Sequence, residues 1–298
     1  MSDTRTAPLP FAARGPERAS RLRSDALVAA ARQARGTRLI AVGADQTIAL
    51  DGASRLARLP AAAAALDADL TLLGVDEEGT TLFAYDATDE LGAGRGRGFA
   101  SLREVALTLD PAEAALAAHA VAIVNWHRTH RFCGRCGART EVEQAGHARR
   151  CPGCGAPIFP RTDPAVIMLV VSGDRCVLSR RFGAPETRWS ALAGFVEPGE
   201  TPEAAVAREV REEVGLEVGT VRYEGAQPWP FPASLMLGFE AELAPGASDA
   251  LAVERSELID AQWFTRAALR EALGDGQIDL PSELSLGHRL IRDWIDAD

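Results

Sequence analysis

The arrangement of the cysteines constrains this chain more than any other feature of its sequence. Cys133 and Cys136 form a CGRC motif, and after fourteen intervening residues Cys151 and Cys154 form a CPGC motif. Two thiolates that are two residues apart can bind one metal ion from a tight turn, and two such pairs supply the four tetrahedral ligands that Zn²⁺ prefers. The spacing therefore predicts a closed, structural zinc site with no position open for a substrate.

Two histidines and a fifth cysteine lie near this cluster in the sequence. His127 and His130 could compete as ligands, but the alternative is that they pack or face solvent, and four thiolates leave no vacancy. Cys176 lies in the apparent strand RCVLSRR, so we expect a buried apolar residue rather than a nucleophile. We therefore assign the zinc ion to the four motif cysteines alone.

The start of the sequence and the use of cysteine together indicate a compartment. The segment MSDTRTAPLPFAARG contains no apolar stretch of the kind that a secretory signal needs. A disulfide framework is not expected in a long chain without such a signal. We therefore expect a cytoplasmic protein.

Length, charge and hydrophobicity exclude several broad classes of protein. The chain has 298 residues, which at ~150 residues for each domain predicts about two domains. Hydrophobic residues make up 47%, so a core can form and the chain is not disordered. No apolar run approaches the ~18 residues of a membrane helix, so we expect no membrane partner. All 32 basic residues are arginine, and the net charge of −10 argues against a general affinity for polyanions.

The part of the chain before the cysteines combines strand and helix patterns. The segment 71–88 predicts two strands joined by an Asp-Glu-Glu-Gly turn, and a helix is predicted to begin at Pro111 and to run toward the first cysteine pair. The glycine-rich segment GAGRGRG, from Gly92 to Gly98, lacks the spacing of a phosphate-binding loop, so we expect a flexible connection there.

The part after the cysteines contains a hairpin pattern and a helix rich in glutamate. AVIMLVV and CVLSRR flank Ser-Gly-Asp and predict two paired strands. The helix is predicted to begin at Pro202, after the N-cap Thr201, and to end before Gly215. It carries glutamates at helical spacing, which favours either a solvated acidic face or a site for a hard cation such as Mg²⁺ or Mn²⁺. These are Glu209, Glu212 and Glu213.

The segment 194–216 resembles the Nudix box, G-x5-E-x7-R-E-U-x-E-E-x-G-U with U apolar, at every fixed position. The matching residues are Gly194, Glu200, Arg208, Glu209, Val210, Glu212, Glu213, Gly215 and Leu216. Nudix hydrolases cleave nucleoside diphosphates linked to another moiety, with divalent ions held by the box glutamates. The resemblance implies the same reaction class for this chain.

A second motif resembles the signature of one branch of that family. Gln227 to Leu235 reads QPWPFPASL and is similar to the SQPWPFPxS motif of NADH pyrophosphatases, which also remove NAD caps from RNA; Ala226 stands where that motif has serine. Three prolines stiffen the loop. The alternative is a rigid surface loop whose rings pack inward. The resemblance implies hydrolysis of NADH or NAD⁺ to nicotinamide mononucleotide and AMP.

The same resemblance implies a set of metal-binding and catalytic residues. Glu209, Glu212 and Glu213 would bind Mg²⁺ or Mn²⁺, and the carbonyl of Ala193 and the side chain of Glu257 would complete the site. Glu213 and Glu212 are the expected catalytic carboxylates, with Glu213 orienting or deprotonating water. Glu254 is the alternative to Glu257, and Arg208 and Glu200 are expected to brace the box rather than perform chemistry.

Substrate contacts are also implied by the resemblance. The expected residues are Phe159, Phe195, Gln227, Pro228, Trp229, Pro230, Phe231, Pro232, Ala233, Ser234 and Gly287. The rings of Phe195, Trp229 and Phe231 could stack on the substrate, since aromatic faces bind bases with little sequence preference. Phe159 stands where family members often carry tyrosine.

These observations predict an α+β protein of three parts: a smaller N-terminal α/β domain (1–125), a four-cysteine zinc ribbon (126–160) and a Nudix domain of α/β/α sandwich fold (161–298). The expected partners are a dinucleotide substrate, NAD-capped RNA 5′ ends and, by resemblance, a second copy of the chain. Two alternatives remain: a Nudix hydrolase of another substrate, such as ADP-ribose or a nucleotide sugar, and a non-catalytic zinc-ribbon protein that binds nucleic acid.

Overall fold

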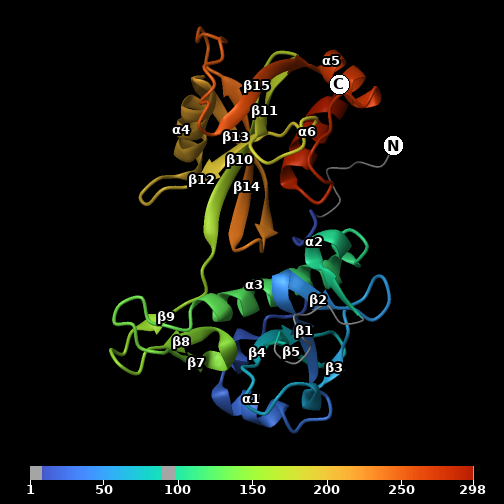
Figure 1. Cartoon of the computed structure of the whole chain (residues 1–298), viewed down its shortest axis with the longest axis vertical. Coiled ribbons are helices and arrows are strands. Elements are labelled where there is room, and N and C mark those ends of the chain that lie inside the picture. The colour runs from blue at the N-terminus through green and yellow to red at the C-terminus, as the bar shows by residue number, and fades with distance from the viewer. Residues whose placement is uncertain (1–8, 89–97, 298) are drawn as a thin grey trace. The chain divides into compact units, whose positions relative to one another are not determined.

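The computed structural model describes residues 9–88 and 98–297, and these form two compact units, each of which is described by itself (Figure 1). The C-terminal unit contains Leu9 and residues 163–227 and 234–297. The N-terminal unit contains residues 10–162 and also the short segment Pro228–Ala233. Of the glycine-rich segment, all but Gly98 lies outside the described residues. No helix among the described residues is long and apolar enough to cross a membrane.

The N-terminal unit is built on a six-stranded sheet. Its strands run in the order β4-β5-β1-β2-β6, with β3 paired to β1 and with β1 parallel to β5. The bounds are β1 Arg38–Val42, β2 Thr47–Ala49, β3 Leu59–Pro60, β4 Thr71–Val75, β5 Thr81–Asp86, β6 Phe99–Ser101, α1 Asp25–Ala31, α2 Leu102–Val105 and α3 Pro111–Thr129. The predicted strand pair (β4 and β5) and the helix that begins at Pro111 are confirmed.

The four cysteines lie in turns outside the strands of a small three-stranded sheet in the same unit. Its strands are β7 Glu141–Glu143, β8 Ala148–Arg150 and β9 Pro157–Ile158, in the order β7-β8-β9. Each CxxC motif forms a turn closed by backbone hydrogen bonds, from Gly137 N to Cys133 O and from Gly155 N to Cys151 O, both 2.8 Å. Gly137 and Gly155 adopt positive φ angles of 76° and 72°, which glycine accommodates without strain.

The C-terminal unit is a sheet with helices on both faces. The strand order is β13-β14-β10-β11-β15, with β12 paired to β10. The bounds are β10 Asp163–Ser172, β11 Arg175–Arg181, β12 Leu192–Phe195, β13 Val218–Trp229, β14 Ser234–Leu243, β15 Leu258–Thr265, α4 Pro202–Val214, α5 Arg266–Gly274 and α6 Leu286–Asp296. The predicted hairpin is confirmed as β10 and β11, which pair antiparallel.

The alternation of side chains along β10 explains the two layers of helices. Val166, Met168 and Val170 pack in the core beneath α4, whereas Ile167 and Leu169 face the core formed with α5 and α6. Successive residues of a strand point to opposite faces of the sheet, so an unbroken apolar strand must be covered on both sides. Figure 1 shows α4 and α6 on opposite faces, so the predicted α/β/α sandwich is confirmed.

Local sequence fixes both ends of α4. The Thr201 hydroxyl accepts a hydrogen bond from Ala204 N at 3.2 Å, and Gly215 follows the helix in the left-handed conformation with φ 73°. The valines at 206, 210 and 214 are fully buried against the sheet. Burial of each such side chain contributes ~1.5–3 kcal/mol, which anchors the helix against the sheet.

Candidate functional site

The four motif cysteines meet in space. Their sulfur atoms lie within 4.8 Å of one another, with 3.7 Å between Cys133 Sγ and Cys154 Sγ and 3.3 Å between Cys136 Sγ and Cys151 Sγ. A tetrahedral ion with Zn–S bonds of ~2.3 Å requires sulfur separations of about 3.8 Å. The donor set and its spacing therefore fit one Zn²⁺ ion, as the sequence predicts.

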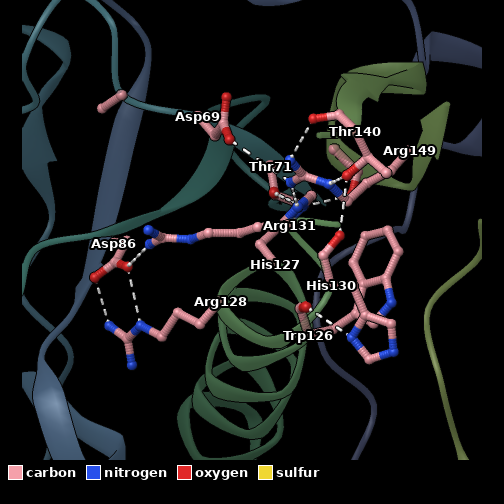
Figure 2. Close-up of polar contacts among 12 residues, drawn as sticks. Asp69, Thr71, Asp86, Trp126, His127, Arg128, His130, Arg131, Thr140 and Arg149 are labelled. Carbon is pink, nitrogen blue, oxygen red and sulfur yellow. Dashed lines mark hydrogen bonds and ion pairs between the residues drawn. The ribbon is translucent and has the colours of Figure 1, made fainter. Parts of the chain in front are cut away.

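The two neighbouring histidines lie outside this cluster and have other partners (Figure 2). The His127 ring is buried; its Nε2 donates to Gly146 O at 2.9 Å, and its Nδ1 accepts from Arg149 at 2.8 Å. Burial and the Arg149 charge lower the pKa of His127 to about 4, so the ring is neutral at physiological pH. His130 Nδ1 lies 3.1 Å from Trp126 O. The packing alternative therefore holds for both histidines.

Arg149 of β8 connects the small three-stranded sheet to α3 and to Asp69, which precedes β4. Its guanidinium also donates to Thr140 Oγ1 at 2.7 Å and to the Thr140 carbonyl at 3.0 Å, and Asp69 lies 3.8 Å away (Figure 2). The Arg149 side chain is only 5% exposed. A buried arginine with this many partners ties the small sheet to α3, because loss of any partner leaves a buried donor unpaired.

Arg208 organises the loop and helix of the Nudix box. It donates to both carboxylate oxygens of Glu200 at 2.9 Å, to Glu209 at 2.8 Å, to Glu212 at 3.0 Å and to the Phe195 carbonyl at 2.9 Å. These contacts raise the pKa of Arg208 and hold the loop against α4. The expected bracing role of Arg208 and Glu200 is confirmed by this geometry.

Glu213 occupies a different environment from the other box glutamates. Its side chain is 1% exposed, and its Oε2 atom is buried without a hydrogen-bond partner. Burial raises its pKa to about 7; the charges of Glu209 and Glu257 act in the same direction, and Arg181 opposes them. A buried, partnerless carboxylate oxygen is costly, so this atom is the best evidence that the box is built to hold a cation.

Arg181 was not predicted from the sequence. It is the last residue of β11, and its guanidinium donates to both the Glu213 carboxylate and the Ala193 carbonyl. The carboxylates and the carbonyl are oxygen donors of the kind that Mg²⁺ and Mn²⁺ prefer, so the residues fit such an ion. No local pattern distinguishes Arg181 from Arg180, because only the pairing of β11 with its neighbours directs it toward α4.

The expected metal-binding residues do not all meet. Within the described ranges the four cysteines alone form a group of three or more potential ligands within 4.8 Å of one another, so the box glutamates are more dispersed. The Glu212 side chain is 55% exposed and pairs with Arg208. Glu257 is close enough to Glu213 to raise its pKa, whereas the Glu254 carboxylate accepts two hydrogen bonds from Ser256. Glu257 therefore remains a better choice than Glu254 for the metal ligand that lies outside the Nudix box.

Gly194 at the end of β12 is required by the position of Glu209. A Cβ atom at residue 194 would lie 1.9 Å from Glu209 Cδ and 2.0 Å from its Oε1. Real Cβ atoms do not approach other heavy atoms so closely, so the carboxylate would have to move. The first glycine of the box therefore leaves space for the side chain of one of its glutamates.

The variant Gly194→Ala should consequently lose activity without losing the fold. We expect turnover to fall about a hundredfold, because a displacement of ~1 Å at a catalytic group can have that effect. Gly274→Ala is the matched control, since a Cβ there meets no atom within 4 Å. Steady-state kinetics and thermal unfolding of both variants test this, and full activity in Gly194→Ala would contradict the assignment of Glu209.

Two of the expected substrate residues lie inside the C-terminal unit. Gln227 is 0% exposed; its side chain donates to Leu284 O at 2.7 Å and accepts from Leu286 N at 2.8 Å. A Cβ at Gly287 would lie 2.8 Å from Ile167 Cδ1, so the glycine allows α6 to pack on β10. In this arrangement both residues position the start of α6, and the structure brings neither to an open surface.

The remaining residues of the QPWPFP motif span the end of β13 and the turn that leads to β14. The segment Pro228–Ala233 packs within the N-terminal unit. Phe231 is 9% exposed and meets the rings of Trp229 and Phe11 edge to face, at centroid distances of 5.2 and 6.0 Å. Trp229 is half-buried. The Phe231 ring is therefore packed inward, and Trp229 retains more accessible surface.

The other expected contact residues are accessible or lie at strand ends. Phe159 and Phe195 are each 61% exposed, so either ring is free to stack on a planar group. Ser234 begins β14 and pairs with Asp163 of β10. Pro228 and Pro232 are exposed, whereas Pro230 is buried. The structure therefore separates the motif into exposed residues and residues that hold the turn in place.

Three family models match consecutive parts of the chain. The NUDIX domain matches residues 161–282, the NADH pyrophosphatase zinc ribbon domain matches residues 128–159, and the NADH pyrophosphatase-like rudimentary NUDIX domain matches residues 21–126. All three descriptions agree with the motifs, the four-cysteine cluster and the α/β/α sandwich described above.

Named relatives are similar over just under two thirds of the chain. The NAD-capped RNA hydrolase NudC of Mycobacterium bovis is 44% identical over 202 residues, which cover 65% of this chain and 64% of that protein. The human NAD-capped RNA hydrolase NUDT12 is 40% identical over 202 residues, or 63% of this chain and 43% of that protein. A solved NUDIX hydrolase from Nitrosomonas europaea is 20% identical, with a TM-score of 0.40 over 50% of this chain and 97% of its own. The match to NudC of Mycobacterium bovis thus spans just under two thirds of the length of that relative.

Proposed function

We propose that this chain, which belongs to the Nudix family, hydrolyses the pyrophosphate of NADH and NAD⁺ to nicotinamide mononucleotide and AMP, and removes NAD caps from RNA. The buried, partnerless Oε2 atom of Glu213 is the observation that carries the hydrolytic part of the proposal. The QPWPFP motif and the relatives named as NAD-capped RNA hydrolases support the choice of substrate.

The proposed mechanism rests on the different environments of the box residues. A divalent ion such as Mg²⁺ or Mn²⁺ would be held by Glu209, Glu213, Glu257 and the Ala193 carbonyl. It would neutralise the charge of the pyrophosphate and lower the pKa of a bound water. Glu213 is the group that would accept a proton from the attacking water, because one of its carboxylate oxygens is buried without a hydrogen-bond partner. Arg208 keeps Glu209 in place, and Glu212, which is exposed, is the second carboxylate available at this helix face.

A comparison of substrates tests the proposal directly. The protein is incubated with Mg²⁺ or Mn²⁺ and with NADH, NAD⁺, NAD-capped RNA, ADP-ribose or a nucleotide sugar at matched concentrations, and the products are identified by chromatography. We expect nicotinamide mononucleotide from the first two substrates and a 5′-monophosphorylated RNA from the third. Preferred cleavage of ADP-ribose or a nucleotide sugar would indicate the other Nudix specificity. Absence of turnover on every substrate would favour a non-catalytic nucleic-acid-binding protein.

The partly exposed ring of Trp229 leads to a further prediction about substrate specificity. Trp229→Ala should lower kcat/KM for NADH about ten- to a hundredfold, because stacking of one base on an aromatic ring contributes roughly 1–3 kcal/mol. ADP-ribose, which lacks nicotinamide, should be affected less. Kinetics on both substrates and thermal unfolding are measured together. Tyr223→Ala is the control, since this 59% exposed ring lies on the same strand six residues earlier. An unchanged preference between the substrates would contradict a recognition role for Trp229.

Two further aspects of the function are also proposals. The family resemblance supports a homodimer, which sedimentation of the purified chain would test. We retain the cytoplasm as the proposed compartment because NAD and RNA are available there, and imaging of the tagged protein would test it. The division into domains 1–125, 126–160 and 161–298 likewise stays a prediction, to be checked by limited proteolysis.

A further inference from the structure

An arginine outside both sequence motifs lies against the segment Pro228–Ala233, here called the aromatic loop. Arg103 belongs to α2 of the N-terminal unit, and its guanidinium carbon lies 4.0 Å from the centre of the Phe231 ring and 5.2 Å from that of Trp229. Phe11, which is 3% exposed, supports the Phe231 ring edge to face. The guanidinium is therefore held by ring faces that are themselves fixed.

No carboxylate neutralises Arg103 within residues 9–88 and 98–297. Arg208 and Arg128 each form an ion pair, with Glu200 at 2.9 Å and with Asp86 at 2.6 Å, whereas no ion pair or side-chain hydrogen bond connects Arg103 to another described residue. Partial burial lowers the pKa of Arg103, as expected for a cation that loses water without gaining an anion.

The geometry of the contact leaves the hydrogen-bonding capacity of this arginine unused. Stacking on an aromatic ring occupies the face of the planar guanidinium, and the N–H groups lie around its edge. Arg103 is exposed as a residue, so these donors are accessible. An accessible, unpaired guanidinium beside a partly exposed indole is the combination with which proteins bind a base and its phosphate.

We propose that Arg103 is a phosphate-binding residue, which donates hydrogen bonds to a phosphate of the substrate held by the aromatic loop. This inference rests on the proposed function and names one further residue that contacts the substrate. The phosphate can come from two sources: the pyrophosphate, which NADH and NAD-capped RNA share, or the phosphates along the RNA chain, which only the capped RNA has.

Two substitutions at residue 103 separate charge from packing. Arg103→Met keeps an unbranched apolar side chain against the rings but removes the charge, and Arg103→Lys keeps the charge without the planar fork. Arg35→Met is the control, because Arg35 is an exposed arginine of the same unit whose side chain has no described partner. We measure kcat/KM for NADH and for NAD-capped RNA at several salt concentrations, together with thermal unfolding.

We expect Arg103→Met to lower kcat/KM about ten- to a hundredfold with an unchanged melting temperature, and Arg103→Lys to restore part of the loss. A loss on both substrates assigns the contact to the pyrophosphate. A loss on capped RNA alone, with the slope of log kcat/KM against log salt reduced by about 0.7, assigns it to the RNA chain. A wild-type kcat/KM of Arg103→Met on both substrates would overturn the proposal. So would a loss of kcat/KM that is accompanied by a lower melting temperature while the salt slope stays unchanged.

A binding measurement distinguishes this inference from the proposed function. If the wild-type protein cleaves neither substrate, the proposed function fails, and titration calorimetry with inorganic pyrophosphate and with a 5′-phosphorylated oligoribonucleotide is then decisive for Arg103. Weaker binding of either probe by Arg103→Met, with no change for Arg35→Met, supports the phosphate contact. Equal binding by all three proteins excludes it.

Discussion

Replacing Glu213 with glutamine is expected to reduce turnover by about 10²- to 10⁴-fold, the range for loss of a positioned general base. The substitution keeps the shape of the side chain and removes the charge that would hold the cation. Because burial already raises the pKa of this carboxyl to about 7, a neutral amide at this position should be tolerated by the fold. Activity is measured with Mg²⁺ and with Mn²⁺, and thermal unfolding is measured in parallel.

Glu212→Gln is the matched control for this prediction. Glu212 lies on the same helix, but its side chain is 55% exposed and its carboxylate is bound by Arg208. We expect a smaller loss of turnover than for Glu213→Gln, even though both residues match the Nudix box. Near-normal turnover in Glu213→Gln would show that the metal and base assignment is wrong.

Replacing Cys133 with serine should release zinc and destabilise the chain by several kcal/mol. Structural zinc contributes roughly 10–16 kcal/mol of apparent binding free energy in zinc-finger peptides, and an ion tied to both CxxC turns joins segments that are far apart in the sequence. Loosening of β8 would also release the buried Arg149 from His127 and Thr140. Activity should fall only through this loss of folded protein.

Zinc content and thermal unfolding test the prediction together. Elemental analysis should find about one zinc per chain in the wild type and much less in Cys133→Ser. Cys176→Ala is the control: Cys176 is fully buried in β11, its pKa is raised to about 12 by that burial, and its removal should leave the zinc content unchanged. A zinc-free variant that is as stable as the wild type would contradict the structural role.

Some features of the site followed from the sequence because they depend on residues that are close together in the chain. The turns that bring Cys133 to Cys136 and Cys151 to Cys154 are encoded within a few residues. The ends of α4 are set in the same way, by Thr201 at one end and Gly215 at the other. The resemblance to the Nudix box also implied that Arg208 and Glu200 would brace the box, and these two residues lie only eight positions apart in the chain.

Other features could not be read from any local pattern. Glutamates at helical spacing look equivalent in the sequence, yet Glu213 is buried with a raised pKa and Glu212 is exposed. The difference arises because β11 and β12 pack beside one side of α4 and bring Arg181 and the Ala193 carbonyl to Glu213. Burial depends on which elements lie next to the helix, and spacing along the helix does not contain that information.

What the sequence by itself determined is the chemistry: four thiolates for one zinc ion, a helix that carries the Nudix glutamates, and a stiff aromatic loop. What only the tertiary structure decided is the role of each side chain within that chemistry. Gln227 is a buried anchor for α6, because its side chain forms hydrogen bonds with Leu284 and Leu286, which lie 57 and 59 residues later in the sequence. Phe231 was packed inward by Phe11 and covered by Arg103. The physical reason is that turns and helix caps form from neighbouring residues, whereas burial and charge pairing arise only when distant segments pack together.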